Sequence, residues 1–184
     1  MINPKRTFDF LFSLIGLLLF GWFILILIIV AFFDTGNGLF LQIRIGQYGR
    51  PFTIFKIRSL HTRTHNISRY GKFLRFTKLD ELPQLLNIFL GDMSFVGPRP
   101  DVPGYYDTLE GEYRKILELK PGLCSYAALK YYNEEALLKK QTDPLKYNDE
   151  VIFPDKVRMN LEYYYTKSFG GDLRIIFETV LKLF

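Results

Sequence analysis

The stretch that decides the fold is Phe10 to Phe33, FLFSLIGLLLFGWFILILIIVAFF, which contains no charged side chain. A helix that crosses the hydrocarbon core of a bilayer needs about 20 apolar residues, and this run satisfies that length. The run is too long for the apolar part of a signal peptide, and no small-residue cleavage site follows it. A core helix of a small domain keeps one polar face, which this run lacks. The sequence therefore predicts an N-terminal membrane helix.

Basic residues flank this run on both sides: Lys5, Arg6, Arg44 and Arg50. Because basic residues favour the cytoplasmic side of a membrane, both ends of the helix are drawn to the same side. A helix that enters the membrane and turns back satisfies both ends, whereas a single span does not. Gly16 and Gly21 are the positions at which such a helix can bend. We favour the re-entrant helix over the span, with residues 1–35 embedded in the membrane and 36–184 forming a cytoplasmic domain.

The composition fits a partner that carries negative charge. The formal net charge is +5, which suits phospholipid, nucleotide or nucleic acid and does not choose among them. An aromatic content of 17% is common in proteins that lie at a lipid–water boundary. Cys124 is the only cysteine, so no intramolecular disulfide can form. His61 and His65 have a helical metal-ligand spacing but lie in a polar stretch without a further ligand, so we expect no metal there.

The rest of the chain reads as a mixed fold, α/β (α+β) and mostly helical. Leu39 to Ile45 alternates in polarity, Gly46 to Gly49 is a turn, and Phe52 to Ile57 is a second extended run, which together predict a β-hairpin. Residues 59–70 read as a polar loop. Short helices are expected at Leu82–Leu90, Tyr113–Leu119, Glu134–Lys140 and Asp155–Thr166.

The last helix has the clearest pattern. Its apolar residues recur at helical spacing: Leu173, Ile176, Phe177, Val180, Leu181 and Phe184. Polar residues take the opposite face, so the helix is amphipathic. Its apolar face suits either the membrane surface or the core of the domain, and the pattern does not decide between them.

Two adjacent carboxylates, Asp80 and Glu81, precede the helix expected at residues 82–90. A helix N-terminus stabilises negative charge, and its free backbone N–H groups can receive a phosphate. Arg75 and Lys78 lie close by in the sequence and offset the repulsion between the two carboxylates. A divalent cation can bridge a carboxylate and a diphosphate, and an aspartate can attack phosphorus as a nucleophile. The alternative is an acidic first helical turn that only stabilises the helix.

The surrounding sequence resembles the bacterial sugar transferases, the small monotopic phosphoglycosyl transferases. The central block runs from Leu79 to Leu85, continues through Asn87 and ends with Gly91 to Pro100, GDMSFVGPRP. Further matching blocks are Arg44 to Phe52, Lys56 to Ser59, Lys5 to Asp9 and Asp172 to Thr179. The resemblance covers nearly the whole chain, and its central block is highly specific.

The resemblance implies transfer of a sugar-1-phosphate from a UDP-sugar to undecaprenyl phosphate with release of UMP, as a first step of surface-glycan assembly. Asp80 then corresponds to the nucleophile that forms a covalent phospho-sugar, and Glu81 with Asp80 to the site of a required Mg²⁺. Arg99, next to Pro98, is expected to bind phosphate, as are Arg75 and Arg58, for which a structural ion pair is the alternative. Guanidinium suits this role because its planar fork donates two hydrogen bonds to phosphate oxygens.

The resemblance also implies where the enzyme works and with what. It places the protein in the bacterial inner membrane, with the catalytic domain on the cytoplasmic face and with amphipathic helices at the interface. Membrane lipids are then partners, a homodimer is compatible with the family, and no nucleic-acid partner is expected. Short members often use N-acetylated amino-sugar donors, which favours such a donor here.

Some positions depart from the family pattern. Phe20-Gly21-Trp22 stands where a Ser-Pro break is usual in the membrane helix, and Lys78 where Ser is common. Leu123 to Ala127 differs in a region expected to contact the sugar or the nucleotide, so the donor stays open. Asn160 replaces an aspartate that is frequent near the C-terminus.

Two other classes of function fit parts of the sequence. An ordinary membrane glycosyltransferase would transfer the sugar alone and release UDP rather than UMP. A basic, membrane-tethered scaffold or nucleic-acid binder would explain the charge and the anchor but leaves the block from Asp80 to Pro100 without a purpose.

Overall fold

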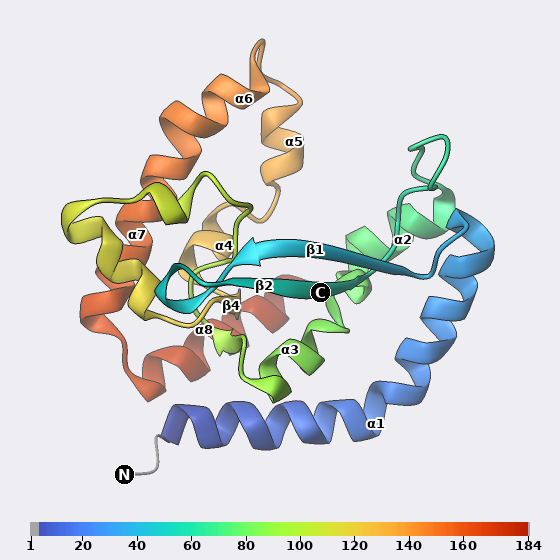
Figure 1. Ribbon diagram of the computed structural model, residues 1–184, viewed down its shortest axis with the longest axis horizontal. Helices are drawn as coiled ribbons and strands as arrows, with labels where there is room; N and C mark the ends of the chain where they lie inside the picture. The colour runs from blue at the N-terminus through green and yellow to red at the C-terminus, as the bar shows by residue number, and fades with distance from the viewer. Residues whose placement is uncertain (1–3, 184) are drawn as a thin grey trace. The chain divides into compact units, whose positions relative to one another are not determined.

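The computed structural model describes residues 4–183, with side chains to residue 182, and it divides into two compact units. The first unit comprises residues 1–44 and 51–94, and the second residues 45–50 and 95–184. Helices dominate and strands are few, which confirms the predicted mixed and mostly helical fold (Figure 1). The predicted division at residue 35 stays a prediction. The elements of the first unit are α1 Pro4–Thr35, β1 Leu39–Ile45, β2 Pro51–Ile57, α2 Arg69–Thr77, the 3-10 turn η2 Leu79–Glu81 and α3 Gln84–Leu90.

Helix α1 is one uninterrupted helix that changes direction about midway (Figure 1). It is long and apolar enough to cross a membrane, and most of its central side chains are exposed. A β-carbon at Gly16 would lie 3.1 Å from the Leu85 side chain, so this glycine allows close packing on α3. Nothing lies within 4 Å of the same position at Gly21, which leaves Gly21 as the glycine that packing does not require.

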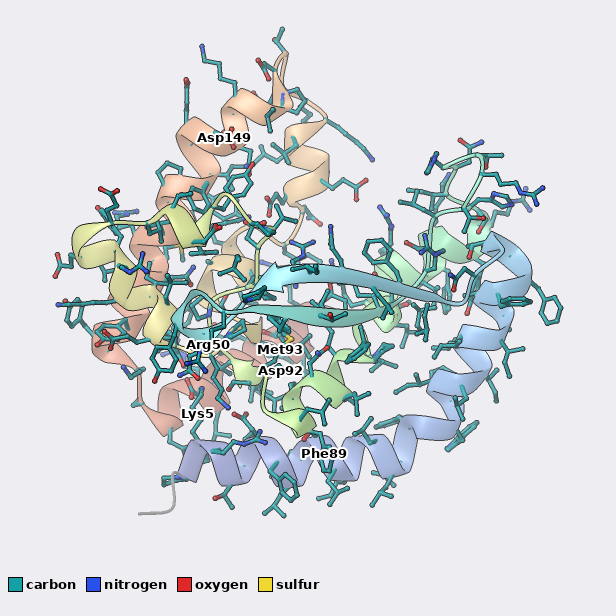
Figure 2. All side chains as sticks on the ribbon, in the orientation of Figure 1. Lys5, Arg50, Phe89, Asp92, Met93 and Asp149 are labelled. Carbon is teal, nitrogen blue, oxygen red and sulfur yellow. The ribbon has the colours of Figure 1, made fainter. Side chains whose placement is uncertain are left out.

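Both ends of α1 are attached to the first unit. Near the start, the Arg6 guanidinium donates to the carbonyls of Ile88 and Phe89 at 2.7 and 2.8 Å, at the C-terminal end of α3. Phe89, labelled in Figure 2, stacks on Phe10 with ring centroids 5.1 Å apart. Near the end, the Tyr70 hydroxyl donates to the Leu27 carbonyl at 2.8 Å. The bend therefore lies between two anchored halves.

The predicted hairpin is confirmed, with β1 and β2 paired in one sheet. The second edge of β2 is occupied by the side chain of Asn87 from α3. Its Oδ1 accepts from Phe55 N at 3.1 Å and its Nδ2 donates to Thr53 O at 2.8 Å. Asn87 is fully buried, so one amide side chain takes the place of a third strand.

Helix α2 is missing from the sequence prediction, which ended the polar loop at residue 70 without a helix after it. Ser68 caps α2 by accepting a hydrogen bond from Gly71 N at 2.9 Å. Leu74 alone among the large apolar residues of α2 is fully buried, in a core with Ile57 and Leu27. Phe73 is exposed, so the apolar residues of this segment do not reveal a buried face.

The second unit holds a small sheet surrounded by short helices. Gly97 and Gly122 lie at the point where strands β3 and β4 diverge, and a β-carbon on Gly122 would fall 2.0 Å from Gly97 N. The elements of this unit are β3 Ser94–Val96, whose first residue belongs to the first unit, the 3-10 helices Gln47–Gly49, Tyr106–Thr108 and Gly111–Glu118, β4 Gly122–Cys124, α4 Tyr126–Lys130, α5 Glu134–Leu138, α6 Pro144–Tyr147, the π-helical turn Asn148–Ile152, α7 Phe153–Thr166 and α8 Phe169–Leu183.

Most predicted helices of the second unit are present with shifted ends. The helix predicted at Tyr113–Leu119 is a 3-10 helix over Gly111–Glu118, and that predicted at Asp155–Thr166 begins at Phe153. Pro154 lies in the first turn of α7, where its missing N–H costs nothing, and a turn of π-helix precedes it. The short helices α4 and α6 were not expected.

Helix α8 shows which face of the predicted amphipathic helix packs. Ile175 is fully buried against Tyr163, Val96 and Cys124. Most of the predicted apolar stripe is exposed instead: Leu173, Phe177, Val180 and Leu181. Phe184, the last member of that stripe, lies outside the described residues. Packing on the domain core therefore uses a neighbouring face of α8, and the apolar stripe stays at the surface.

Candidate active site

The predicted nucleophile lies on a sharp turn of the first unit. Helix α2 ends at Lys78, whose φ of 58° places it in the left-handed region, and η2 starts at the next residue. A lysine pays for this conformation with strain, because only glycine adopts it freely. The left-handed residue redirects the chain within one residue, so that Asp80 and Glu81 follow on a tight turn that leads into α3.

Glu81 is held by a lysine of the hairpin. The Lys56 Nζ lies 3.1 Å from Glu81 Oε1, and the two side chains are 17% and 11% exposed. Strand β2 therefore supplies a partly buried ion pair next to the predicted nucleophile. A pair with so little solvent around it depends on both partners, because the loss of one leaves a buried charge alone.

Asp80 has a buried carboxylate oxygen, Oδ1, that accepts no hydrogen bond within the described part of the chain. Burial, and then the neighbouring charge of Glu81, raise the pKa of the Asp80 carboxyl above its ordinary value. Three cations oppose this shift: Lys56, Lys78 and Arg75. A raised pKa and an unsatisfied acceptor are typical of functional sites, since a purely structural carboxylate would be paired.

The same residues fit a magnesium site that a substrate completes. No group of three or more metal-binding side chains is found among the described residues. Mg²⁺ needs fewer, since it is usually bound by one or two carboxylates together with substrate phosphates and water. The unsatisfied Asp80 oxygen next to the Glu81 carboxylate matches that donor set.

The two arginines predicted to contact phosphate in this unit differ. Arg75 lies within electrostatic reach of Asp80, since its charge lowers the pKa of that carboxyl, and its Nε donates to Ser59 Oγ at 2.9 Å. Arg58 serves the hairpin: its Nε donates to the Leu39 carbonyl at 3.2 Å, and its guanidinium lies 5.3 Å from the centre of the Phe40 ring. Phosphate binding by either arginine stays a prediction.

Arg99 and Pro98 belong to the second unit. The Pro98 carbonyl accepts a hydrogen bond from Gly122 N at 2.8 Å, so the turn that carries Arg99 is attached to the start of β4. Pro98 is buried and Arg99 is exposed, and both line a small hollow with Gly46. The backbone on which Arg99 stands is thus rigid, while its contact with phosphate stays a prediction.

Asn160, which replaces the aspartate frequent in the family, has a defined partner. Its Nδ2 donates to the Tyr106 hydroxyl at 2.8 Å, and both residues are buried. Two residues further along α7 after Leu161 and Glu162, the Tyr163 hydroxyl donates to Asp172 at 2.5 Å and joins α7 to α8. Asn160 therefore contributes to the packing of this unit.

Sequence reasoning assigned no role to Lys56 and Gln84, although both lie in motifs it recognised. Lys56 had one visible signal, a lysine inside the otherwise apolar strand from Phe52 to Ile57. Gln84 had none, because a glutamine in the first turn of a short helix is unremarkable by type. Its burial, with 1% of the residue exposed, is visible only in the structure.

Comparison with known proteins agrees with this geometry. The sequence profile of the bacterial sugar transferase family matches residues 2–184. The UDP-glucose:undecaprenyl-phosphate glucose-1-phosphate transferase of Caulobacter vibrioides is 31% identical over 97% of this chain and 69% of its own length. An exopolysaccharide production protein, PSS, of Rhizobium leguminosarum is 34% identical over 96% of this chain and 93% of its own.

Other relatives differ in length and in the sugar that their names give. The UDP-glucose:undecaprenyl-phosphate glucose-1-phosphate transferase of Escherichia coli is 32% identical over 98% of this chain, which spans only 40% of that protein. The UDP-N-acetylgalactosamine-undecaprenyl-phosphate N-acetylgalactosaminephosphotransferase of Aeromonas hydrophila is 29% identical over 96% of this chain and 42% of its own length. With a family profile that covers nearly every residue and a relative matched almost end to end, this chain belongs to the bacterial sugar transferase family.

Proposed function

We propose that this protein transfers a sugar-1-phosphate from a UDP-sugar to undecaprenyl phosphate, with Asp80 as the nucleophile. The relatives that name a reaction name one of this type. The observation that carries the proposal is the buried, unsatisfied oxygen of Asp80, next to a glutamate that Lys56 holds in place. This carboxylate lies in the central motif of the family, at the position from which a phosphorus atom would be attacked.

The reaction then has two displacements at one phosphorus atom. In the first, a carboxylate oxygen of Asp80 bonds to the phosphorus that bears the sugar, and the bond from that phosphorus to the bridging oxygen breaks. UMP leaves with the bridging oxygen and its electron pair, and an aspartyl phospho-sugar remains. In the second, a phosphate oxygen of undecaprenyl phosphate bonds to the same phosphorus, and the Asp80 carboxylate leaves.

The charges around Asp80 suit both displacements. Burial makes its carboxylate a less solvated and therefore more reactive nucleophile, while the nearby cations Lys56, Lys78 and Arg75 keep it ionised. Asp80 and Glu81 would hold Mg²⁺, which supplies positive charge against the diphosphate when it is bound. Arg99 would bind a phosphate of the donor or of the lipid, since a guanidinium grips phosphate with two parallel hydrogen bonds.

The membrane helix fits a re-entrant arrangement at the inner face of the bacterial inner membrane. Both halves of α1 are anchored to the first unit on either side of the bend, by Arg6 at one end and by Tyr70 at the other. A straight span would carry one end away from that unit. Helical hydrogen bonds continue along the whole of α1, so the bend exposes no backbone group that lipid could not satisfy.

The test is a reaction of the whole protein in nanodiscs that contain undecaprenyl phosphate, with a panel of UDP-sugars. We expect UMP from at least one donor, a requirement for Mg²⁺, and a phospho-sugar mass on Asp80 when the lipid acceptor is omitted. Asp80→Asn should give neither UMP nor the adduct, whereas Glu110→Gln, the same change at an exposed position, should give both. Release of UDP in place of UMP would show an ordinary glycosyltransferase, and turnover by Asp80→Asn above about a tenth of the wild-type rate would exclude Asp80.

A further inference from the structure

Three buried side-chain atoms lack a hydrogen-bond partner among the described residues, and all three lie between residues 80 and 94. They are Asp80 Oδ1, Gln84 Nε2 and Ser94 Oγ. Native proteins satisfy most of their buried polar atoms, so each exception calls for an explanation. A cluster of them in the first unit, on the segment that carries the nucleophile, points to one common cause.

Two of these atoms are complementary. Asp80 Oδ1 only accepts hydrogen bonds when the carboxylate is ionised, and Gln84 Nε2 only donates them. The residues are four apart on a continuous right-handed backbone, since Leu82 and Pro83 between them both have helical φ and ψ. Side chains at this spacing lie on adjacent turns, with β-carbons about 5–6 Å apart in an α-helix. A glutamine side chain spans that distance.

We infer that Gln84 is a positioning residue, whose amide donates a hydrogen bond to Asp80 Oδ1 and so presents the second carboxylate oxygen to phosphorus. This inference rests on the proposed function of Asp80. The structure explains why an amide suits the position: Gln84 is almost fully buried, and a cation there would compete with the Lys56–Glu81 pair for the same carboxylates. A neutral donor orients the nucleophile without adding a charge to a buried site.

The hydrogen bond also acts in the second displacement. When undecaprenyl phosphate takes the phospho-sugar, negative charge returns to the Asp80 carboxylate as it leaves. A donor already directed at Oδ1 stabilises that developing charge and requires no rearrangement. Gln84 therefore affects the formation and the breakdown of the aspartyl phospho-sugar, and it has no contact with the sugar or the uridine in this scheme.

Asn87 is the matched control for a buried amide on the same helix. Its side chain is fully occupied between Phe55 and Thr53 of β2, so it serves the fold. Loss of this amide should lower the melting temperature, whereas loss of the Gln84 amide should lower kcat. The comparison separates a general effect of removing a buried amide from an effect on the nucleophile.

The experiment measures kcat and KM for the donor from the UDP-sugar panel that yields most UMP, with the whole protein in nanodiscs. Gln84→Met keeps the length of the side chain without the donor, and we expect kcat to fall about 10- to 100-fold, the range for a hydrogen bond to a charged group, with KM within about twofold. Gln84→Glu keeps the shape but places a second negative charge next to Asp80, so its kcat should fall further. Asn87→Ala should destabilise the protein without this ordering of kcat. Equal kcat values for wild type and Gln84→Met would overturn the inference and leave the role of Asp80 intact.

A second measurement needs no turnover, so it decides the inference even if no donor in the panel is used. Thermal unfolding is recorded for Gln84→Met, Asp80→Asn and the double variant. If the two side chains are hydrogen-bonded, their effects on Tm should be non-additive by about 2 °C or more. Additive shifts would show that the two groups do not interact, and Gln84 would then have no positioning role.

Discussion

The ion pair between Lys56 and Glu81 lends itself to a quantitative test through Lys56→Met, which keeps the apolar stem and removes the charge. The Nζ lies 3.1 Å from the carboxylate, and the two side chains are 17% and 11% exposed. Removing one partner of a fully buried pair costs about 3–5 kcal/mol. Since some solvent reaches this pair, we expect the lower end, about 3 kcal/mol. For a chain of this size each kcal/mol lowers Tm by about 2–4 °C, so Tm should fall by about 6–12 °C.

The assay is thermal unfolding in nanodiscs of four proteins: wild type, Lys56→Met, Glu81→Gln and the double variant. The double variant leaves no lone buried charge, so it should be more stable than the sum of the two single effects predicts. A Tm drop below about 2 °C for Lys56→Met, or single effects that add within about 0.5 kcal/mol, would refute the reasoning.

The same variant has a kinetic consequence with a definite sign. Burial and Glu81 raise the pKa of Asp80, and Lys56 is the largest of the influences that lower it. Only the ionised carboxylate attacks phosphorus, so activity is lost as pH falls through this pKa. Without Lys56 the pKa rises further, and the acid limb of kcat/KM should move to higher pH. A limb that stays in place or moves to lower pH would contradict the assigned electrostatics.

Three further predictions concern other parts of the chain. Arg99→Lys keeps the charge but loses the planar fork, so kcat/KM should fall at least tenfold with an unchanged Tm; a near-normal rate would indicate that Arg99 acts as a point charge. Gly122→Ala places a β-carbon 2.0 Å from Gly97 N, so the protein should lose its fold in the second unit, seen as a Tm lowered by about 5 °C or more or as failure to express; normal stability would refute the close approach. Single cysteines at Asn3 and Asn37, in a background without the native cysteine, should both resist a membrane-impermeant reagent added to intact cells; labelling of the first alone would establish a true span and leave the assigned chemistry in place.

The sequence by itself determined the features that depend on local pattern and on motif. The charge-free run from Phe10 to Phe33 predicts a membrane helix because no backbone or side-chain group in it needs water. The alternation from Leu39 to Ile45 predicts a strand, since side chains alternate between the two faces of a sheet. The pair Asp80-Glu81 stands out because it lies in a block of residues that the family shares. Each of these features follows from neighbours along the chain.

Only the tertiary structure decided which of these residues act together and which are structural. Lys56 is 25 residues from Glu81, and no local pattern could reveal that strand β2 places its amine on that carboxylate. Asn87 shares a motif with the nucleophile but serves as the third strand of a two-stranded sheet. Gln84 is distinguished by burial alone. Burial and partner choice depend on residues distant in sequence, and they set the desolvation and the charge that determine reactivity.

The amphipathic helix α8 and the bent helix α1 illustrate the same division. The spacing of apolar residues predicts that α8 has two faces, but the core selected Ile175 and left Leu173 and Phe177 exposed. The run of apolar residues predicts that α1 is a helix, but its bend follows from attachments at both ends, by Arg6 and by Tyr70. Periodicity specifies what a segment can bury, whereas the surface against which it packs is built by the rest of the chain.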